Sequence, residues 1–557
     1  MPLIYLILFV LAIFLIGYFF NVRFLKRYFD LDPKKETPAN QVNDGVDFVP
    51  TSKFFLLGQH FSAIAAAGPI VGPILAGVWF GWLPVLCWIV GGAIFFGAFH
   101  DFSTLIGSVR HKAVSIVEMV RDLFGPRGHL LFTAFVWLSL MYVITAFTDL
   151  TSASFSEPSL GGGVATSSVL YLFIGVAMGI ALKKLKMNLG LATPLFIALV
   201  CVAIWYGQKI PLTVSAVDPF SAQQIWNFIL IGYCAVASLL PVWALLQPRG
   251  YLGGFFLYAT LIAGLVGLFI GGEPIQYPAF IGWHSAQGFP LFPILFVTVA
   301  CGACSGFHGL VSSGTTSKQI KNETDCGCVG YGAMILEGVV AILALATVMI
   351  LAQGDVLAGA SPDRIYAAGL SRFIGHLGLP REFVQSFVLL AFTTFIYDTL
   401  DVATRLARYL LQEVLRWKEN QGRLLATGLS LLIPLACVSM RVTDQAGNVI
   451  PAWKVFWTVF GTSNQLLAAF SLFAIALWMK RIGKNWLLAL IPMTFLLTMT
   501  VWSFGRMILM ALKRGGLDLP ASIAVVLLGL AFFLILESIR FSFSRGLLGP
   551  LARARKS

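Results

Sequence analysis

The sequence predicts an all-α polytopic membrane protein, and three observations lead to this fold class. Of the 557 residues, 58% are hydrophobic and only 11% are charged, and the mean hydropathy is +0.85. A soluble protein of this length needs a polar surface that such a composition cannot supply. The apolar residues also fall in blocks of about 17–28 residues, the length at which a helix crosses ~30 Å of hydrocarbon. Because backbone in hydrocarbon must satisfy its own hydrogen bonds, blocks of this length form helices.

The apolar blocks predict about fifteen membrane-spanning helices. The first block lacks a basic leading segment and a small-residue cleavage site, so we interpret it as a retained helix rather than a signal peptide. The expected spans are 2–20, 54–78, 82–108, 130–154, 165–183, 189–206, 225–246, 255–272, 290–314, 329–352, 384–410, 423–439, 453–479, 485–511 and 521–543.

The distribution of basic residues predicts the orientation in the membrane. The net charge is +13, but the basic residues lie between apolar blocks rather than in one patch, which argues against a nucleic-acid partner. Alternation of fifteen spans places most of the 38 Lys and Arg residues on one side, with Arg249, Lys418 and the basic C-terminal tail among them. The positive-inside rule makes that side cytoplasmic, so we expect the N-terminus outside and the C-terminus inside.

The eight cysteines show no pattern of a secreted disulfide scaffold. Cys301 and Cys304 in one block and Cys326 and Cys328 in a polar loop have spacings that a zinc site could use. The two pairs belong at different depths, so this is a minor alternative and no metal or cofactor is expected. The other four, Cys87, Cys201, Cys234 and Cys437, fit small core positions.

Two stretches of the chain resemble each other. Residues 116–149 and residues 365–398 each read as an amphipathic segment, a turn and a long span. The turns are Gly125-Pro126-Arg127 and Leu379-Pro380-Arg381. Each stretch is preceded by two spans, and the orientation count makes the first copy run outward and the second inward. The sequence therefore predicts inverted repeats.

The first span before each copy carries the residues expected to interrupt a helix. One holds Gly68-Pro69-Ile70-Val71-Gly72-Pro73, and the other holds Cys301-Gly302-Ala303-Cys304-Ser305-Gly306-Phe307-His308-Gly309. Proline lacks an N–H and clashes with the preceding turn, although glycine and proline also serve close packing in membrane helices. Interrupted helices in matching positions of inverted repeats indicate a transporter's central site. We therefore expect Gly68, Pro69, Gly72, Ser305 and Gly306 to line a substrate site, where freed N–H groups would favour a carboxylate.

Acidic residues inside the 384–410 span are candidates for ion coupling, because charge in hydrocarbon is costly. Asp398 and Asp401 share a helical face with Thr394 and Arg405. These carboxylates could take up a proton, or bind a cation together with hydroxyls. The alternative is a structural ion pair from Asp401 to Arg405 or Arg408.

Three histidines lie in or near the interrupted spans. His60 lies on the early one and His308 on the later one, and either could bind substrate or relay a proton, or simply pack with a hydrogen bond. The His100-Asp101 pair could gate, carry protons or cap its helix.

Four further polar residues lie toward span ends. Asn464 and Gln465 form a polar cluster that we expect to line the substrate pathway. Glu337 and Asp149 could face water or lie at the membrane interface.

At these residues the sequence resembles the carbon starvation protein A (CstA) family of transporters. The resemblance covers about residues 20–480 and rests on long, unusual motifs. They are Asn43 to Thr51, Gly58 to Ala76, Ser305 to Thr316, Asn322 to Asp325, Asp398 to Arg405 and Phe460 to Leu466.

The resemblance implies a bacterial inner-membrane protein of the amino acid–polyamine–cation superfamily, with a LeuT-like five-plus-five inverted repeat and extra helices. It implies an N-terminal helix and cytoplasmic segment at 1–53, repeat one at 54–206 and connecting helices at 207–289. Repeat two would occupy 290–480, and C-terminal helices with a basic tail 481–557. It also implies uptake of peptides, or of pyruvate with protons, in a family associated with carbon starvation.

The leading functional hypothesis is a secondary active transporter that imports a pyruvate-like carboxylate or a short peptide, coupled to protons or to a cation such as sodium. A passive channel is the alternative, and it would need a continuous polar lining. A membrane-embedded, metal-dependent enzyme built on His60, His100, Asp101 and His308 ranks last, because no HExxH or comparable ligand spacing is present.

Overall fold

The computed structural model describes residues 2–44, 48–241, 243–417, 420–440, 442–443 and 449–544. Residues 45–47 of the family motif, Lys418 and the basic tail after residue 544 lie outside the described residues.

Within these ranges the protein is a bundle of helices, and the one sheet described is a two-residue antiparallel pairing of β1 (Val442–Thr443) with β2 (Val449–Ile450). The helices of the first half are α1 Leu3–Tyr28, α2 Pro38–Val42, α3 Lys53–Ile64, α4 Gly68–Phe80, α5 Trp82–Gly92, α6 Ala98–Arg110, α7 Ile116–Phe155, α8 Gly161–Lys183, α9 Leu189–Gly207, α10 Ala222–Leu239 and α11 Leu246–Gly271. Those of the second half are α12 Leu291–Thr298, α13 Ala300–Ala303, α14 Gly306–Gly314, α15 Gly332–Met349, α16 Pro362–Gly375, α17 Arg381–Leu415, α18 Asn420–Ser439, α19 Ala452–Arg481, α20 Leu487–Lys513 and α21 Leu519–Ser544. Single turns of π- or 3₁₀-helix are η1 Ala93–Gly97, η2 Thr316–Gln319, η3 Glu323–Asp325, η4 Gly327–Tyr331 and η5 Val356–Gly359.

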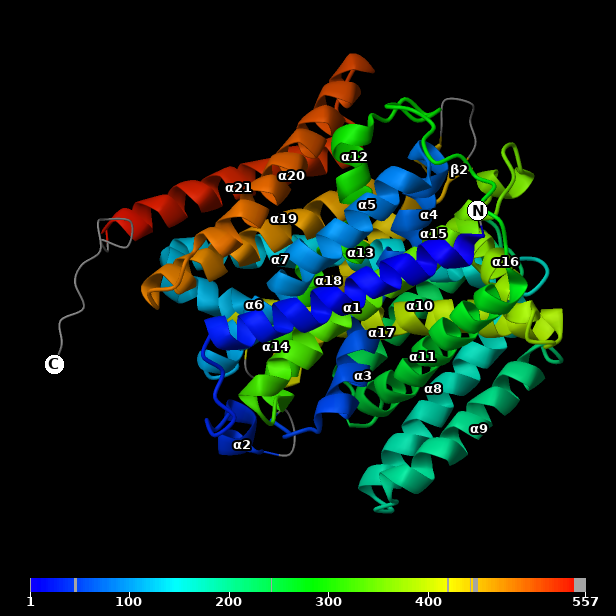
Figure 1. Ribbon diagram of the computed structural model, residues 1–557, viewed down its shortest axis with the longest axis horizontal. Coiled ribbons are helices and arrows are strands. Elements are labelled where there is room, and N and C mark those ends of the chain that lie inside the picture. The colour runs from blue at the N-terminus through cyan, green and yellow to red at the C-terminus, as the bar shows by residue number, and fades with distance from the viewer. Residues whose placement is uncertain are drawn as a thin grey trace.

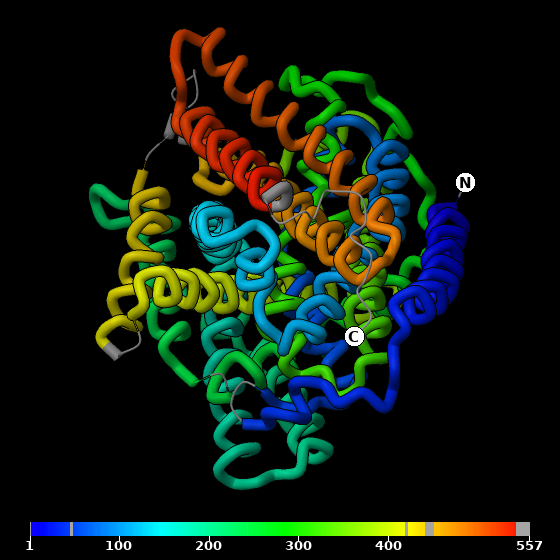
Figure 2. The backbone as a smooth tube through the Cα atoms, turned by 90° about the vertical axis from the view of Figure 1, so that its left-hand side faces the viewer, coloured from blue at the N-terminus to red at the C-terminus, as the bar shows by residue number. Residues whose placement is uncertain are grey.

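The central helices are buried, and pairs of more exposed helices lie at the edges. Helices α17 and α19 have 83% and 94% of their apolar windows buried, whereas α1, α9 and α21 have 28%. The α8–α9 pair lies at one corner and the α20–α21 pair at the opposite corner, and both views agree on this arrangement (Figures 1 and 2). The most buried helices are thus among those that carry the polar residues predicted to form the functional site.

The membrane prediction is confirmed in its class and adjusted in its count. Among the described residues, thirteen helices are long and apolar enough to span a membrane, and α3 with α4 makes a fourteenth as a bent pair. The expected span 290–314 is not one of them, because it is divided into the short helices α12, α13 and α14. The fifteen predicted segments therefore correspond to fourteen spans, one of which is the bent pair α3–α4, and to one segment that is divided into three short helices.

Both predicted interruptions are present, but their positions differ from those expected. Helices α3 and α4 meet at a bend of 49° at residues 65–67, before Pro69 rather than at it. Pro69 lies in the first turn of α4, where a missing N–H costs nothing, and Pro73 lies inside the helix without breaking it. In the second segment the chain leaves helical geometry at Cys304 and Ser305.

The two interrupted segments cross at their breaks. A Cβ atom on Gly68 would lie 2.3 Å from Cys301 Sγ, and one on Gly72 would lie 2.3 Å from the carbonyl oxygen of Thr298. Such contacts are too short for any side chain, so these glycines permit the close packing of α4 against α12 and α13. The structure thus gives these glycines a part in helix packing, and their predicted place in a substrate site stays a prediction.

The predicted turn at Gly125 is confirmed. Helix α7 runs for 40 residues, but Gly125 has φ 80° and ψ 175°, so two helical pieces meet there. Ser115 caps the first piece by accepting a hydrogen bond from the Glu118 amide at 3.2 Å. The corresponding turn of the second copy separates α16 from α17. The five-plus-five organisation and its boundaries stay a prediction.

Candidate functional site

A cavity of about 540 Å³ lies between α3, α11, α14 and α17 and opens beside the loop that precedes α7. Exposed side chains at its mouth include Lys112 and Glu413, whereas the buried side chains of His60 and Asp398 lie at its inner end. The cavity thus reaches from one surface of the bundle to the first bent helix pair.

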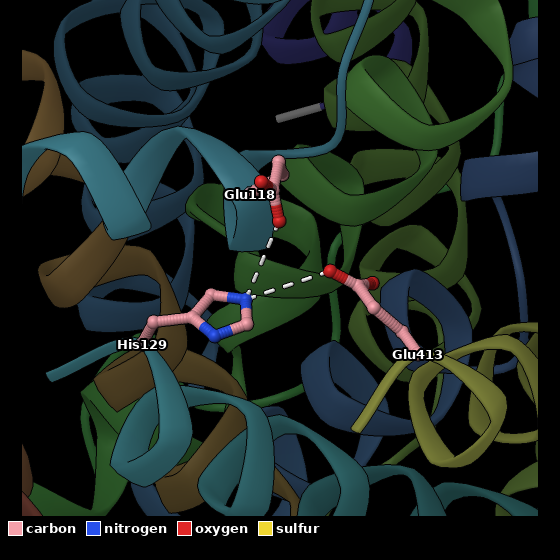
Figure 3. A group of neighbouring side chains, drawn as sticks. All are labelled: Glu118, His129 and Glu413. Carbon is pink, nitrogen blue, oxygen red and sulfur yellow. Dashed lines mark ion pairs between the residues drawn. The ribbon is translucent and has the colours of Figure 1, made fainter. Parts of the chain in front are cut away.

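Three side chains meet at the mouth of this cavity. His129 Nε2 lies 3.5 Å from a Glu118 carboxylate oxygen and 3.6 Å from one of Glu413, and the group joins the two pieces of α7 to the end of α17 (Figure 3). Their donor atoms all lie within 4.8 Å of one another, so a metal ion could fit here, although ion pairs account for the arrangement. Among the described residues, no such group includes Cys301, Cys304, Cys326 or Cys328, and all eight cysteines are free.

A buried arginine balances the two acidic candidates of α17. Arg249 Nε donates to Asp398 at 2.8 Å, and its Nη2 lies 2.7 Å from Asp401. Ser62 of α3 donates to the other oxygen of Asp398 at 2.7 Å, and Tyr233 of α10 donates to Asp401 at 3.1 Å. We call Arg249, Asp398 and Asp401 the arginine cluster.

The arginine cluster corrects two expectations. Arg249 was assigned to a cytoplasmic loop, but α11 begins at Leu246 rather than near residue 255, and the arginine is fully buried. The alternative pairing of Asp401 with Arg405 or Arg408 is wrong. Those two arginines donate instead to the main-chain oxygens of residues 237, 238 and 240. The sequence prediction placed Arg249 in a loop because it lies between the expected spans 225–246 and 255–272.

Thr394 lies one helical turn before Asp398 and is buried, and its hydroxyl has no hydrogen-bond partner within the described part of the chain. An unpaired buried hydroxyl is uncommon and is compatible with ion binding at this position. Its role in ion coupling stays a prediction.

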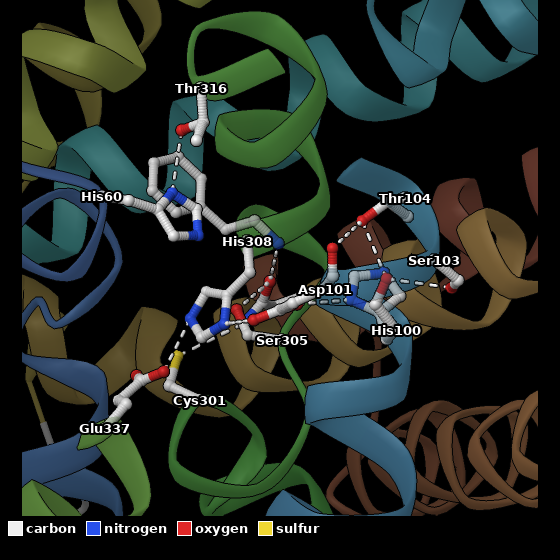
Figure 4. A network of polar contacts seen from close by, with 12 residues as sticks. His60, His100, Asp101, Ser103, Thr104, Cys301, Ser305, His308, Thr316 and Glu337 are labelled. Carbon is white, nitrogen blue, oxygen red and sulfur yellow. Dashed lines mark hydrogen bonds and ion pairs between the residues drawn. The ribbon is translucent and has the colours of Figure 1, made fainter. Parts of the chain in front are cut away.

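A second buried cluster lies around His308 (Figure 4). His308 Nδ1 lies 2.9 Å from Asp101 Oδ2, and His308 Nε2 lies 3.1 Å from Glu337 Oε2. On the other oxygen of Asp101, His100 Nδ1 lies at 2.8 Å. We call His308, Asp101 and Glu337, with His100 beside them, the histidine cluster.

The histidine cluster joins three elements, with Asp101 from α6, His308 from α14 and Glu337 from α15. Glu337 does not face water, one of the two placements expected for it, because its side chain is fully buried and faces His308. Sequence reasoning missed this pairing because the position of Glu337 near the start of its span suggested exposure.

His60 belongs to the cavity rather than to the histidine cluster. Its Nδ1 lies 2.9 Å from the Thr316 hydroxyl, whereas its Nε2 is buried without a hydrogen-bond partner in the described structure. The side-chain oxygen of the neighbouring Gln59 is also unpartnered, and both residues line the cavity. Two polar atoms beside the inner end of the cavity thus lack a partner in the described structure, and both are covered by neighbouring groups.

The polar cluster on α19 holds the second interruption in place. Asn464 Oδ1 accepts from the Phe307 amide at 2.8 Å, and Asn464 Nδ2 donates to Ser305 Oγ at 3.0 Å. A Cβ on Gly306 would lie 2.4 Å from a main-chain nitrogen of α19, so α14 begins in close contact with that helix. Gln465 donates to the Phe296 carbonyl at 3.3 Å. Ser305, Gly306, Asn464 and Gln465 are not among the residues that line the cavity, and their predicted place on the substrate pathway stays a prediction.

Asp149 does not face water, which is one of the two placements expected for it. Its side chain is buried and accepts hydrogen bonds from Gln223, Asn227 and the Trp453 amide, each at 2.9 Å. It ties α7 to α10 and α19.

Comparison with known proteins places the chain in a family. The model of the family described as "Carbon starvation protein CstA" matches residues 3–365 and 355–503. Similar proteins include a "Pyruvate/proton symporter BtsT" of Escherichia coli, 30% identical over 89% of this chain and 80% of the relative. A "Peptide transporter CstA" of the same organism is 32% identical over 88% and 79%. That of Bacillus subtilis is 30% identical over 94% of each chain.

Among solved structures, a manganese transporter of Eremococcus coleocola covers 89% of this chain at 13% identity with a TM-score of 0.48, a similarity too low to carry an argument. The sequence comparisons are sufficient to assign the family, because the family model matches nearly the whole chain. The protein therefore belongs to the carbon starvation protein CstA family.

Proposed function

We propose that this protein is a secondary active transporter that imports a pyruvate-like carboxylate or a short peptide across the cytoplasmic membrane by alternating access. The names of its relatives, a pyruvate/proton symporter and peptide transporters, support this substrate range. The observation that carries the proposal is the cavity, which runs from one surface to unpartnered polar groups at the first bent helix pair. Binding at a helix interruption is the arrangement that transporters of this kind use.

The charges around the cavity support an anionic or zwitterionic substrate. Three acidic side chains line it, Glu118, Asp398 and Glu413, and Asp398 is paired with Arg249 behind the wall. Three basic side chains, Lys112, Lys318 and Arg405, also line it, and none of them has a carboxylate partner within the described part of the chain. The wall therefore presents both signs of charge, with basic groups available to a substrate carboxylate. A volume of about 540 Å³ lies in the range of small-molecule sites.

Alternating access is supported by the one-sided opening. A second hollow of about 370 Å³ lies at the far end of α7, with Glu157 and Arg364 in its lining, and shares no lining residue with the cavity. With the N-terminus outside and the C-terminus inside, as the basic residues indicate, the cavity opens to the cytoplasm. We therefore assign this conformation to the inward-facing state. The coupling ion would be a proton or a cation such as sodium, with Thr394, Asp398, Asp401, His100 and Asp101 as candidate residues.

Uptake into proteoliposomes tests the function. Labelled pyruvate and a labelled dipeptide are offered with and without an inward pH gradient, and we expect one of them to accumulate when the gradient is present. Flux that equilibrates without accumulation under any ion gradient would identify a passive channel. Flux of neither substrate would contradict the proposed function.

A pair of variants tests whether the cavity is the pathway. Ala63 lies in the cavity wall, and Ala63→Trp should fill the inner end and abolish uptake. Leu191 on α9 is 65% exposed on the outside of the bundle, so Leu191→Trp adds the same side chain without entering the cavity and should transport normally. Normal uptake by Ala63→Trp would show that substrate takes another route.

A further inference from the structure

We propose that the coupling proton is carried by the histidine cluster, with the carboxylate of Glu337 as the group that binds and releases it. This inference rests on the proposed transport function and deepens it. It assigns coupling to a site apart from the cavity, and it gives a role to Glu337, a residue that sequence reasoning placed at the interface.

The contacts of His308 determine how many protons the histidine cluster holds. Both ring nitrogens of His308 face carboxylate oxygens, at 2.9 Å from Asp101 and 3.1 Å from Glu337. A neutral imidazole has one N–H, so it can face only one of two ionised carboxylates favourably. Two protons on the ring satisfy both contacts and leave the three groups with a net charge of about −1. A third proton, on a carboxylate, makes them neutral.

The surroundings supply no fixed charge that would replace this third proton. The titratable groups that face the cluster are His60 from α3, His100 from α6 and Cys301 and Cys304 from α13. None of the ion pairs of the cluster involves Lys or Arg among the described residues. A net negative charge buried in this way is costly, so the cluster has room for one exchangeable proton.

Glu337 is the member that is held least tightly. Asp101 has a histidine partner on each oxygen, but both oxygens of Glu337 lack hydrogen bonds within the described structure, and the 3.1 Å contact with His308 lacks hydrogen-bond geometry. A fully buried carboxylate without hydrogen bonds is the group that gains most from protonation. Proton binding forms an O–H bond on Glu337 and takes the charge of the cluster from about −1 to zero, and release breaks that bond.

Helix α14 connects the cluster to the substrate cavity. His308 lies on its first turns, and Leu310 and Gly314 of the same helix line the cavity. The non-helical residues Cys304 and Ser305 separate α14 from α13, so the position of α14 relative to α6 and α15, which carry Asp101 and Glu337, is not fixed by α13. A shift of α14 on substrate binding would change the distances between His308 and both carboxylates. Proton affinity and substrate occupancy are thereby linked.

The test separates exchange of substrate from accumulation of substrate. Exchange of labelled for unlabelled pyruvate or dipeptide across the membrane needs no net proton movement, whereas accumulation driven by a pH gradient does. Glu337→Gln keeps the size of the side chain and imitates its protonated form. We expect this variant to retain exchange and to lose accumulation.

Glu382→Gln is the matched control, because it makes the same substitution at an exposed position at the start of α17, outside both the cluster and the cavity. It should accumulate substrate as the unmodified protein does. Accumulation by Glu337→Gln at the level of the unmodified protein would overturn the inference. Failure of the unmodified protein to exchange or accumulate either substrate would instead overturn the proposed function.

A direct proton measurement covers the case in which Glu337→Gln does not fold. Pyruvate or the dipeptide is added to the detergent-solubilised protein in weak buffer with a pH-indicator dye. We expect a proton signal from the unmodified protein and its loss in His308→Gln, which removes the imidazole between the carboxylates. An unchanged proton signal in His308→Gln would overturn the inference.

Discussion

The arginine cluster and the histidine cluster both bury two carboxylates in the middle of the bundle, but they balance them with different groups. Arg249 places a permanent cation between Asp398 and Asp401, with contacts of 2.8 and 2.7 Å. His308 places a titratable ring between Asp101 and Glu337, at 2.9 and 3.1 Å. The guanidinium balances its carboxylates with a charge that is permanent at any physiological pH, whereas the histidine cluster has no permanent cation and can take up a proton on Glu337.

The charge of the arginine cluster is therefore fixed, whereas that of the histidine cluster can change by proton exchange. The arginine cluster joins α3, α10, α11 and α17 through Ser62, Tyr233, Arg249 and the two aspartates, so we assign it chiefly to holding the cavity wall together. The histidine cluster joins α6, α14 and α15 around the ring of His308. Four predictions break or sharpen this distinction.

The largest expected effect comes from removing the permanent cation. Arg249→Ala leaves two buried carboxylates without compensation, and breaking a buried pair in this way typically costs about 3–5 kcal/mol. We expect a large fall in the thermal unfolding midpoint in detergent. Arg381→Ala, at an exposed position of the same charge, should leave the midpoint unchanged. An Arg249→Met variant that also carries Asp398→Asn and Asp401→Asn should recover most of the loss, and no recovery would show that the arginine acts through packing alone.

The next effect distinguishes the two clusters by their role in transport. Asp398→Asn leaves Arg249 paired with Asp401, so the protein should fold. Asp398 links Ser62 of α3 to α11 and lines the cavity, so we expect loss of both exchange and gradient-driven accumulation. Glu337→Gln should lose accumulation alone. Equal transport defects in the two variants would remove the distinction, and normal accumulation by Asp398→Asn would refute a role for that aspartate.

A smaller effect concerns the coupling ion. A guanidinium already lies between Asp398 and Asp401, so replacing sodium by choline should leave the initial uptake rate unchanged. Collapsing the pH gradient with a protonophore should abolish accumulation. Uptake that falls when sodium is removed would instead indicate that Thr394, Asp398 or Asp401 binds the cation.

The smallest effect comes from an ion pair on the surface. Burial alone would raise the pKa of Glu157, but Arg364 at 2.5 Å and the amides of Ser159 and Leu160 outweigh it and hold the pKa at about 2. A depressed pKa stabilises the fold above the unfolded value of about 4.3, and this contribution is lost as the pH falls toward 2. Because solvent screens the arginine of the pair, whose side chain is 53% exposed, Glu157→Gln should cost at most about 1 kcal/mol at pH 7.

Thermal unfolding at pH 7 and pH 4 measures this difference. The difference in unfolding midpoint between the unmodified protein and Glu157→Gln should be smaller at the lower pH. At pH 4 the carboxylate of the unfolded chain is partly protonated, while that of the folded protein stays charged. A gap that widens on acidification would contradict the sign of this assignment.

The sequence by itself determined the membrane class, the two interruptions and the turn at Gly125. Apolar block length, proline chemistry and a left-handed glycine act within a few residues of their own position, so they can be read locally. The sequence did not determine the exact position of the first interruption, because the helix bends before Pro69 rather than at it. The sequence also identified most of the buried polar residues, since charge in hydrocarbon stands out.

Only the tertiary structure decided which of these residues meet. Arg249 and Asp398 are 149 positions apart, and His308 and Asp101 are 207 apart, so no local pattern links them. The pairing depends on where α11 begins and on how α6, α14 and α15 pack around one ring. Burial is the reason that these pairings matter for stability, because a carboxylate away from water needs a partner. The same carboxylates at a water interface, where Glu337 and Asp149 were expected, would need none.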